Sequence, residues 1–89
     1  MVGARIDPEE VEKFAKELRR FNTELRNSRT RIQGRFNLLG ETWRDRKHER
    51  FTQEFNQIMR IIEQFLKISE EHVGFLIKDA KFIRTYLEH

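Results

Sequence analysis

The sequence predicts an all-α fold, an antiparallel helical hairpin, from three observations. Apolar residues recur at alternating steps of three and four, which is the spacing of a helix face. The 89-residue chain has a single Pro, at Pro8, where it does not interrupt a long helix. Capping signals at Asp7 and near Gly40 divide the chain into two helical stretches with a very short connection. The expected bounds are one domain over residues 1–89, a first helix over about 8–39, a turn over 40–42 and a second helix over about 43–86.

The first helix has clear start and stop signals. Asp7 is a suitable N-cap, Pro8 fits the first helical position, and Glu10 completes an Asp-x-x-Glu capping arrangement. Gly40 is the expected residue after the last turn, where glycine commonly adopts a left-handed conformation. A narrow heptad row of apolar residues, interrupted at Ser28, is typical of a coiled-coil seam. This row consists of Val11, Phe14, Leu18, Phe21, Leu25, Ile32, Phe36 and Leu39.

The second helix is expected to begin with Thr42 as its cap, with Asp45 three residues later. It is far more apolar than the first helix, since 17 large apolar side chains follow Trp43 and the first helix carries nine. The expected a and d positions are His48, Phe51, Phe55, Ile58, Ile62, Phe65, Ser69, His72, Leu76, Asp79, Ile83 and Tyr86. Two further rows, at the e and g positions, are apolar from Ile58 onward.

One hairpin does not cover this second helix. Folding back at the predicted turn places Pro8 opposite Gly74 and leaves residues 75–86 without a partner in their own chain. Because a large exposed apolar patch is unusual, we expect a homodimer that forms an elongated four-helix bundle. A heterodimer with a related hairpin is the alternative. The expected dimer interface consists of Phe55, Ile58, Ile62, Phe65, Phe75, Leu76, Phe82, Ile83 and Tyr86.

Composition excludes several classes of protein. The single Pro and four Gly exclude collagen-like and Pro/Gly-rich disordered chains. The absence of Cys excludes disulfides, thiolate zinc sites and cysteine nucleophiles. No apolar run approaches the ~20 residues that span a bilayer, and Met1 to Glu12 lacks the apolar segment of a signal peptide. We expect a cytoplasmic protein, with secretion without a cleavable signal peptide as the alternative.

A Trp directly follows the predicted turn, in the stretch Leu38-Leu39-Gly40-Glu41-Thr42-Trp43-Arg44-Asp45. Phe51 follows this Trp at plus eight. In length, hairpin layout and Trp position, nearly the whole chain resembles the WXG family of bacterial type VII secretion, which includes the early-secreted-antigen-like proteins. Asp45 stands where the family motif Trp-x-Gly has its Gly. The turn motif carried over from the family is Gly40, Trp43, Asp45 and Phe51.

The resemblance implies a non-enzymatic, dimeric protein that is a secretion substrate or its adaptor or chaperone-like partner, in contact with the secretion machinery. It also implies that Trp43 is a recognition residue in a cleft at the turn, whereas the residues alone favour packing of Trp43 on Leu39 and the first helix. Tyr86 occupies the place of the Tyr in the family's export signal. The ending Leu87-Glu88-His89 resembles the start of an affinity tag and is assigned no function. A scaffold of this family adapted to another cytoplasmic role is equally consistent.

The charge distribution leaves two other functions open. Residues 19–50 hold ten basic and four acidic side chains, so a nucleic-acid-associated hairpin is one alternative. We favour a solvated face, because the aromatic residues follow the core heptad and do not interleave with Arg. The third interpretation is a structural helical subunit of a larger complex. The basic residues of the nucleic-acid hypothesis are Arg19, Arg26, Arg44, Arg46 and Arg50.

Metal binding and catalysis have little support. His48 and His72 lie 24 residues apart, without the spacing of ligands on one helix face. With Ser69 and Asp79 they are expected to form a buried polar layer that fixes the helix register. Histidine in such a layer predicts pH-sensitive dimerisation. No nucleophile with a base and no Gly-rich phosphate loop is present, so we expect no enzymatic activity, no cofactor and no small-molecule substrate.

Overall fold

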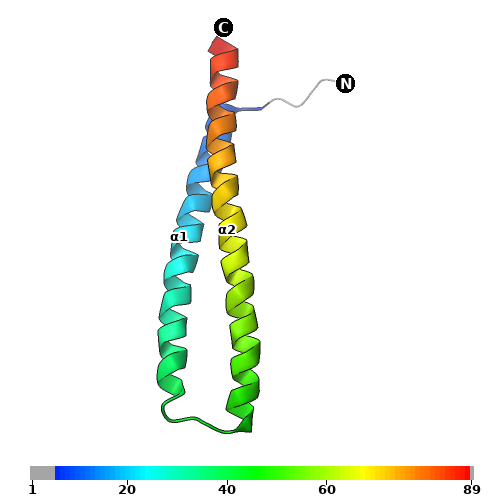
Figure 1. The fold of residues 1–89 in the computed structure, drawn as a ribbon. Helices are drawn as coiled ribbons and strands as arrows, with labels where there is room; N and C mark the ends of the chain where they lie inside the picture. Colours follow the sequence, from blue (N-terminus) through cyan, green and yellow to red (C-terminus); the bar gives the residue numbers. More distant parts are fainter. Residues whose placement is uncertain (1–5, 89) are drawn as a thin grey trace.

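The computed structural model describes residues 6–88 and shows two long antiparallel helices (Figure 1). Helix α1 is Pro8–Leu39 and helix α2 is Arg46–Glu88, in a hairpin with extents of 66 × 25 × 15 Å. The predicted all-α hairpin is therefore confirmed. Two expectations concern residues that lie partly outside the described range. The expected absence of a signal peptide involves residues 1–5, and the tag-like ending involves His89.

Helix α1 begins as its capping signals predict. The Asp7 carboxylate accepts a hydrogen bond from the Glu9 amide at 2.9 Å, and the Asp7 carbonyl accepts the first intrahelical bond from Val11 at 3.1 Å. The end of α1 differs from the expectation. Gly40 has φ −64°, so the backbone stays right-handed, and the predicted left-handed glycine cap is wrong. The chain leaves α1 through further helix-like turns, in which the Trp43 amide donates to the Leu39 carbonyl at 2.9 Å.

Helix α2 begins at Arg46, three residues later than predicted. Its cap is Asp45, whose carboxylate accepts from the His48 amide at 2.9 Å and whose carbonyl accepts from the Glu49 amide at 3.1 Å. The Thr42 hydroxyl instead donates back to the Leu39 carbonyl of α1 at 3.4 Å, so it does not cap α2. A carboxylate is among the strongest N-caps, which explains why the helix starts after Asp45 and not after Thr42.

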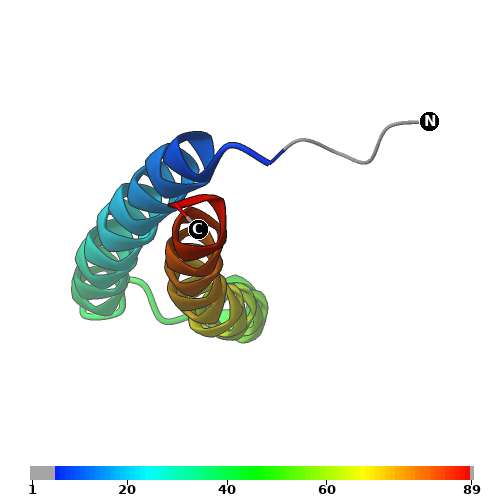
Figure 2. The ribbon, with the colours of Figure 1, turned by 90° about the horizontal axis from the view of Figure 1, so that it is seen from above.

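The two helices are not parallel to each other. They lie close together near the chain termini and separate toward the loop (Figure 2). At the close end the contact is made by small residues, since Ala15 and Ala80 are fully buried. At the wide end large rings fill the gap, and the Phe36 and Phe55 rings stack with their centroids 4.3 Å apart. The buried residues of the seam between the helices are Ala15, Asn22, Phe55, Met59, Leu66, Ser69, Val73 and Ala80.

The seam of α2 is only partly the predicted a and d row, from which Phe55 and Ser69 are buried. The row Met59, Leu66, Val73 and Ala80 faces α1, while Ile58 and Phe65 remain 52% and 44% exposed. The apolar stripe of α2 is wider than one seam, so its periodicity does not determine which part faces α1. The small side chain of Ala80 favours the rotation that is seen, because it lets the helices approach closely.

The predicted overhang of residues 75–86 is also wrong. The Arg84 guanidinium pairs with the Glu12 carboxylate at 2.8 Å, so α1 runs beside α2 almost to its end. The loop between Leu39 and Arg46 is longer than predicted, and α2 starts beyond the end of α1 (Figure 1). The start of α1 at Pro8 therefore lies beside a part of α2 that follows Gly74. Among the described residues, neither helix is long and apolar enough to cross a membrane.

Candidate protein-interaction face

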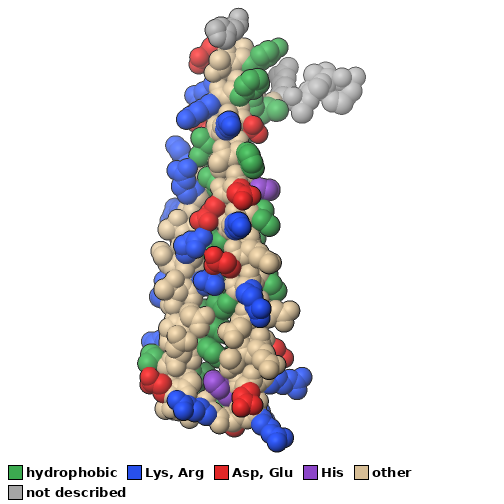
Figure 3. Space-filling view, viewed as in Figure 1, with side chains coloured by type: hydrophobic (Ala, Val, Ile, Leu, Met, Phe, Trp, Pro, Cys, Tyr) green, Lys and Arg blue, Asp and Glu red, His purple; other side chains and the backbone are tan. Residues whose placement is uncertain are grey.

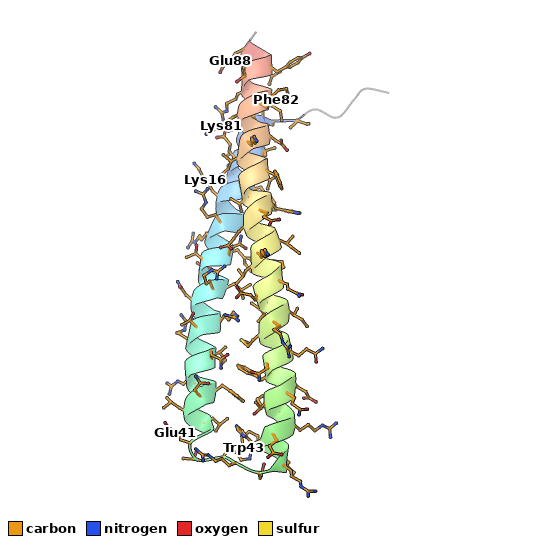
Figure 4. All side chains as sticks on the ribbon, in the orientation of Figure 1. Lys16, Glu41, Trp43, Lys81, Phe82 and Glu88 are labelled. Carbon is orange, nitrogen blue, oxygen red and sulfur yellow. The ribbon has the colours of Figure 1, made fainter. Side chains whose placement is uncertain are left out.

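One side of the hairpin, here called the apolar face, leaves large hydrophobic side chains in water. On α2, Phe75 is 62% exposed and Phe82 is 74% exposed, and Phe82 points away from α1 (Figure 4). On α1, Phe14 and Phe21 are 58% and 50% exposed. The other side of the hairpin is charged, and hydrophobic side chains gather along the edge of α2 that is turned away from α1 (Figure 3). The exposed apolar residues of α2 are Phe51, Ile58, Ile61, Phe65, Ile68, Phe75, Phe82, Tyr86 and Leu87.

Helix α2 carries two apolar stripes that lie more than a third of a turn apart around its axis. The first contains Met59 and Leu66 and is covered by α1. The second contains Ile61, Phe65 and Ile68 and is uncovered. A helix of a four-helix bundle contacts neighbouring helices on two different sides. The hairpin supplies one neighbour of α2, and the second position is open.

Three shallow grooves run along the apolar face between α1 and α2. The groove near the termini has a volume of about 470 Å³ and is lined by Phe14, Leu18, Phe65, Ile68, Ser69, His72, Phe75 and Leu76. A second, of about 580 Å³, is lined by Leu25, Ser28, Arg29, Arg31, Ile32, Arg35, Met59 and Ile62. The third, of about 250 Å³, lies toward the loop and is lined by Ile32, Arg35, Phe36, Leu39, Phe51 and Phe55. This row of open, mainly apolar hollows suits the side chains of another helix.

The residues predicted for the dimer interface fall into three groups. Ile58, Phe65, Phe75, Phe82 and Tyr86 lie exposed on the apolar face. Three more, Ile62, Leu76 and Ile83, are half-buried beside the seam. Phe55 is only 8% exposed because it packs on Phe36 of its own chain, so it contributes little free surface to the groove that it lines.

The prediction also missed residues of the apolar face. Ile61 and Ile68 are 57% and 55% exposed on α2, and Phe14 belongs to the same face of α1. The signal was present in the sequence, because Ile61, Ile68, Phe75 and Phe82 recur every seven residues. This recurrence does not by itself identify the exposed face of α2, because the sequence does not show which apolar stripe α1 covers.

The turn motif forms an aromatic cluster at the loop end of the hairpin. The half-buried Trp43 ring lies edge-on to His48, with centroids 5.0 Å apart, and 6.2 Å from the Phe51 ring. Figure 4 shows Trp43 in the loop beside the start of α2. The ring therefore packs on two residues of α2, while its packing on Leu39 and the first helix stays a prediction. Gly40 belongs to the cluster, because a Cβ at this position would lie 3.7 Å from the His48 imidazole.

Asp45 links the motif to the start of α2. The hydrogen bond from the His48 backbone amide is the main cause that lowers the pKa of Asp45 below its usual value, and a side-chain hydrogen bond with Trp43 adds to it. Partial desolvation opposes this shift. The residue that replaces the motif's Gly therefore acts as a charged helix cap, which is the role the residue type predicts.

The predicted four-residue polar layer does not form. Ser69 donates a hydrogen bond to the Asn22 side-chain oxygen at 2.8 Å, and both residues are buried. His48 lies in the turn cluster, about 30 Å along α2 from Ser69, because each residue adds about 1.5 Å to a helix. His72 and Asp79 are exposed. Asn22, a lone polar residue in the α1 seam, is the partner that the prediction missed.

The basic residues of the nucleic-acid hypothesis do not form one free patch. Arg26 pairs with Glu70 at 2.8 Å on the charged side of the hairpin, and Arg50 pairs with Glu54 on its own helix at 3.7 Å. The Arg44 side chain donates to the Gly40 carbonyl at 2.9 Å. Several of these cations thus serve contacts within the chain, and the geometry does not favour a nucleic-acid surface. In the part of the chain that the structure describes, no group of three His, Asp or Glu could hold a metal ion.

The fold and the turn motif together define a helical hairpin with Trp at its turn. The chain belongs to the WXG100 family, described as proteins of 100 residues with WXG, whose family model matches residues 3–83. The resemblance found in the sequence is therefore confirmed. The comparison with curated proteins gave no match.

Among solved structures, the chain is similar to the secreted protein EsxB from Bacillus anthracis strain Sterne. The selenomethionine-labelled form is 27% identical, with a TM-score of 0.79 over 97% of this chain and 98% of that one. A wild-type crystal form is also 27% identical, with a TM-score of 0.78 over 94% and 97% of the two chains. The likeness therefore covers the whole hairpin.

Proposed function

We propose that this chain is a type VII secretion substrate, or an adaptor-like partner of one, that works as a dimer through its apolar face. Membership of the WXG100 family and the likeness to a secreted hairpin protein support the secretion part. The uncovered second stripe of α2 is the observation that carries the dimer. The proposed role is one of protein–protein interaction, without catalysis.

The energetics support a partner on the apolar face. Full burial of each large apolar side chain contributes about 1.5–3 kcal/mol. Five side chains of α2 on this face are aromatic, and aromatic side chains typically dominate the binding energy of interfaces. These are Phe51, Phe65, Phe75, Phe82 and Tyr86. A second hairpin on this face would complete a four-helix bundle and cover the three grooves.

The turn cluster is the proposed contact with the secretion machinery. Trp43 is half-buried and Phe51 is 45% exposed, so both rings remain in part accessible at the loop end. A rigid aromatic pair beside a capped helix start provides a pre-organised surface for a partner protein.

A secretion assay tests this function. The chain is expressed in a bacterium with an active type VII ATPase and in one with an inactive ATPase, and the culture medium is assayed against a cytoplasmic marker. We expect the protein in the medium only with the active ATPase. Trp43→Ala should reduce the secreted fraction while the cellular amount stays the same. Equal amounts in the medium of both strains would contradict the proposal.

A further inference from the structure

The charged side of the hairpin carries a groove of its own, in the half of the molecule near the termini. This groove has a volume of about 240 Å³ and lies between α1 and α2. None of its lining residues takes part in the three grooves of the apolar face. It is here called the basic groove, and it is lined by Arg19, Asn22, Thr23, Glu70, Val73 and Gly74. A partner that covers the apolar face therefore leaves the basic groove open.

Two rows of residues, one on each helix, border the basic groove. Both rows advance in steps of four and three, so each row stays on one side of its helix. Ion pairs join the rows at both ends, Arg26 with Glu70 at 2.8 Å and Arg84 with Glu12 at 2.8 Å. The row of α1 is Glu12, Lys16, Arg19, Thr23 and Arg26, and the row of α2 is Glu70, Gly74, Ile77, Lys81 and Arg84.

Between these two ion pairs, the charged residues of both rows are all basic. Within the described residues, Lys16, Arg19 and Lys81 form no ion pair. Figure 4 shows Lys16 on α1 and Lys81 on α2, both in the half of the hairpin near the termini. The carboxylates of Glu12 and Glu70 are already paired with their Arg partners. The basic groove therefore carries positive charge that the rows themselves leave unmatched.

The groove is open because α2 has no side chain at Gly74. A Cβ there would meet no atom within 4 Å beyond its own helix, so no contact within the hairpin requires a glycine. Glycine inside a helix nevertheless destabilises it by about 0.5–1 kcal/mol relative to Ala. Beneath the groove, Asn22 is 3% exposed, and its amide nitrogen has no hydrogen-bond partner in the described part of the chain. A local cost without a structural gain is typical of functional sites.

We infer that the basic groove binds an acidic segment of a partner protein. A carboxylate of the partner enters beside Gly74 and pairs with Arg19, whose guanidinium can donate two parallel hydrogen bonds to it. A second carboxylate reaches Lys16 or Lys81 at the rim of the groove. Because the groove lies away from the apolar face, this interaction goes beyond the proposed dimer and operates in monomer and dimer alike.

The ends of the two rows limit the length of the acidic segment. From Glu12 to Arg26 the row of α1 spans about 21 Å, with a carboxylate of Glu12 at one end and of Glu70 at the other. A nucleic-acid backbone or an anionic membrane would bring negative charge to these carboxylates as well as to the cations, and like charges repel. A flat membrane surface also does not enter a groove. A short acidic segment meets the cations alone.

A peptide titration followed by NMR of the isotope-labelled chain tests the inference. The probe is a blocked peptide of sequence Ser-Glu-Ala-Glu-Ser, and the matched control peptide is Ser-Gln-Ala-Gln-Ser. The amide resonances of Thr23 and Gly74 should shift with the acidic peptide and not with the control. No shift at about 10 mM acidic peptide, or equal shifts with both peptides, would overturn the inference. So would binding of phosphatidylglycerol vesicles through these residues while the acidic peptide has no effect.

Variants locate the binding in the groove. Gly74→Gln fills the groove and should abolish the shift of Thr23, whereas Gly34→Gln, at the other exposed helix-interior glycine, should preserve it. Arg19→Gln should weaken peptide binding by about three- to fivefold. Arg60→Gln removes the same charge from an exposed position of α2 outside the groove and should leave the peptide Kd unchanged.

Two further measurements separate this inference from folding and from the dimer. Circular dichroism should show that all four variants stay helical, since each substitution lies at an exposed position. Equal weakening by Arg19→Gln and Arg60→Gln would indicate general charge attraction and would overturn the groove. Sedimentation should give the same mass for Gly74→Gln as for the wild-type chain. A monomeric wild-type chain that still binds the acidic peptide would refute the proposed dimer and support the basic groove.

Discussion

Asp45 caps α2 through its charged carboxylate, and this makes the hairpin sensitive to acid. Its pKa is lowered in the folded chain, chiefly by the hydrogen bond from the His48 amide. The stabilisation it contributes is present above the unfolded pKa of about 3.9 and is lost as the pH falls through the folded value. We therefore expect the melting temperature to fall as the pH drops below about 4.

Asp45→Asn separates this contribution from general acid unfolding. Asn is an equally good N-cap but does not titrate, so the melting temperature of this variant should depend less steeply on acid pH. Asp45→Ala should lower the melting temperature at neutral pH as well. Thermal melts followed by circular dichroism from pH 2 to 7 check both. An unchanged acid slope in Asp45→Asn would show that the cap is not the titrating element.

The buried pair of Asn22 and Ser69 predicts an unequal response to single and double substitution. Ser69→Ala leaves both polar groups of the Asn22 amide without a partner and should destabilise the hairpin by about 1–3 kcal/mol. Adding Asn22→Leu removes the unpaired amide and should recover most of this loss. Urea unfolding of the two variants measures the difference. A double variant that is less stable than Ser69→Ala would contradict this account.

At the scale of the helices, two interior glycines weaken the structure without serving a contact. A Cβ at Gly34 or Gly74 would meet no atom within 4 Å beyond the chain neighbours and backbone of its own helix. Ala loses less backbone entropy than Gly in a helix, so Gly34→Ala and Gly74→Ala should each stabilise the chain by about 0.5–1 kcal/mol. Denaturant unfolding at fixed protein concentration measures this gain. A loss of stability in either variant would reveal a role for that glycine beyond the structure seen.

The helices could be predicted from the sequence, but their mutual rotation could not. The cap at Asp7 and the heptad rows specify local structure, which depends on neighbours within one or two turns. The side of α2 that faces α1 depends on contacts such as Ala15 and Ala80 at the close end, which a periodicity count does not rank. The loop length depends on which of two candidate caps three residues apart, Thr42 or Asp45, starts α2, and this also sets the register of the two helices.

The candidate site shows the same division. The Trp of the turn motif and the excess of apolar residues on α2 were visible in the sequence, and they led to the correct family. Phe55, predicted for the dimer interface, is only 8% exposed because its ring stacks on Phe36 of the same chain. The proposed dimer is supported by the uncovered face of α2, and not by the unpartnered residues 75–86 that the sequence predicted.

At the scale of the whole molecule, Phe82 should matter for assembly and not for the hairpin itself. It is 74% exposed and points away from α1, so Phe82→Asp removes no contact with α1 (Figure 4). We expect this variant to weaken the dimer by at least about tenfold, because a charge would enter an apolar interface. Lys81→Gln, its neighbour on the outer side, changes the net charge equally and should have no effect. Size-exclusion chromatography with light scattering compares the two, and equal behaviour would remove Phe82 from the interface.

The central claim is that a second copy of this chain covers the apolar face. Sedimentation equilibrium of the wild-type chain at micromolar concentrations tests this claim most directly. We predict a mass of twice the 10.9 kDa of one chain. A mass of 10.9 kDa, with full helicity and no change on concentration, would show that the uncovered stripe of α2 is stable in water and would contradict the account.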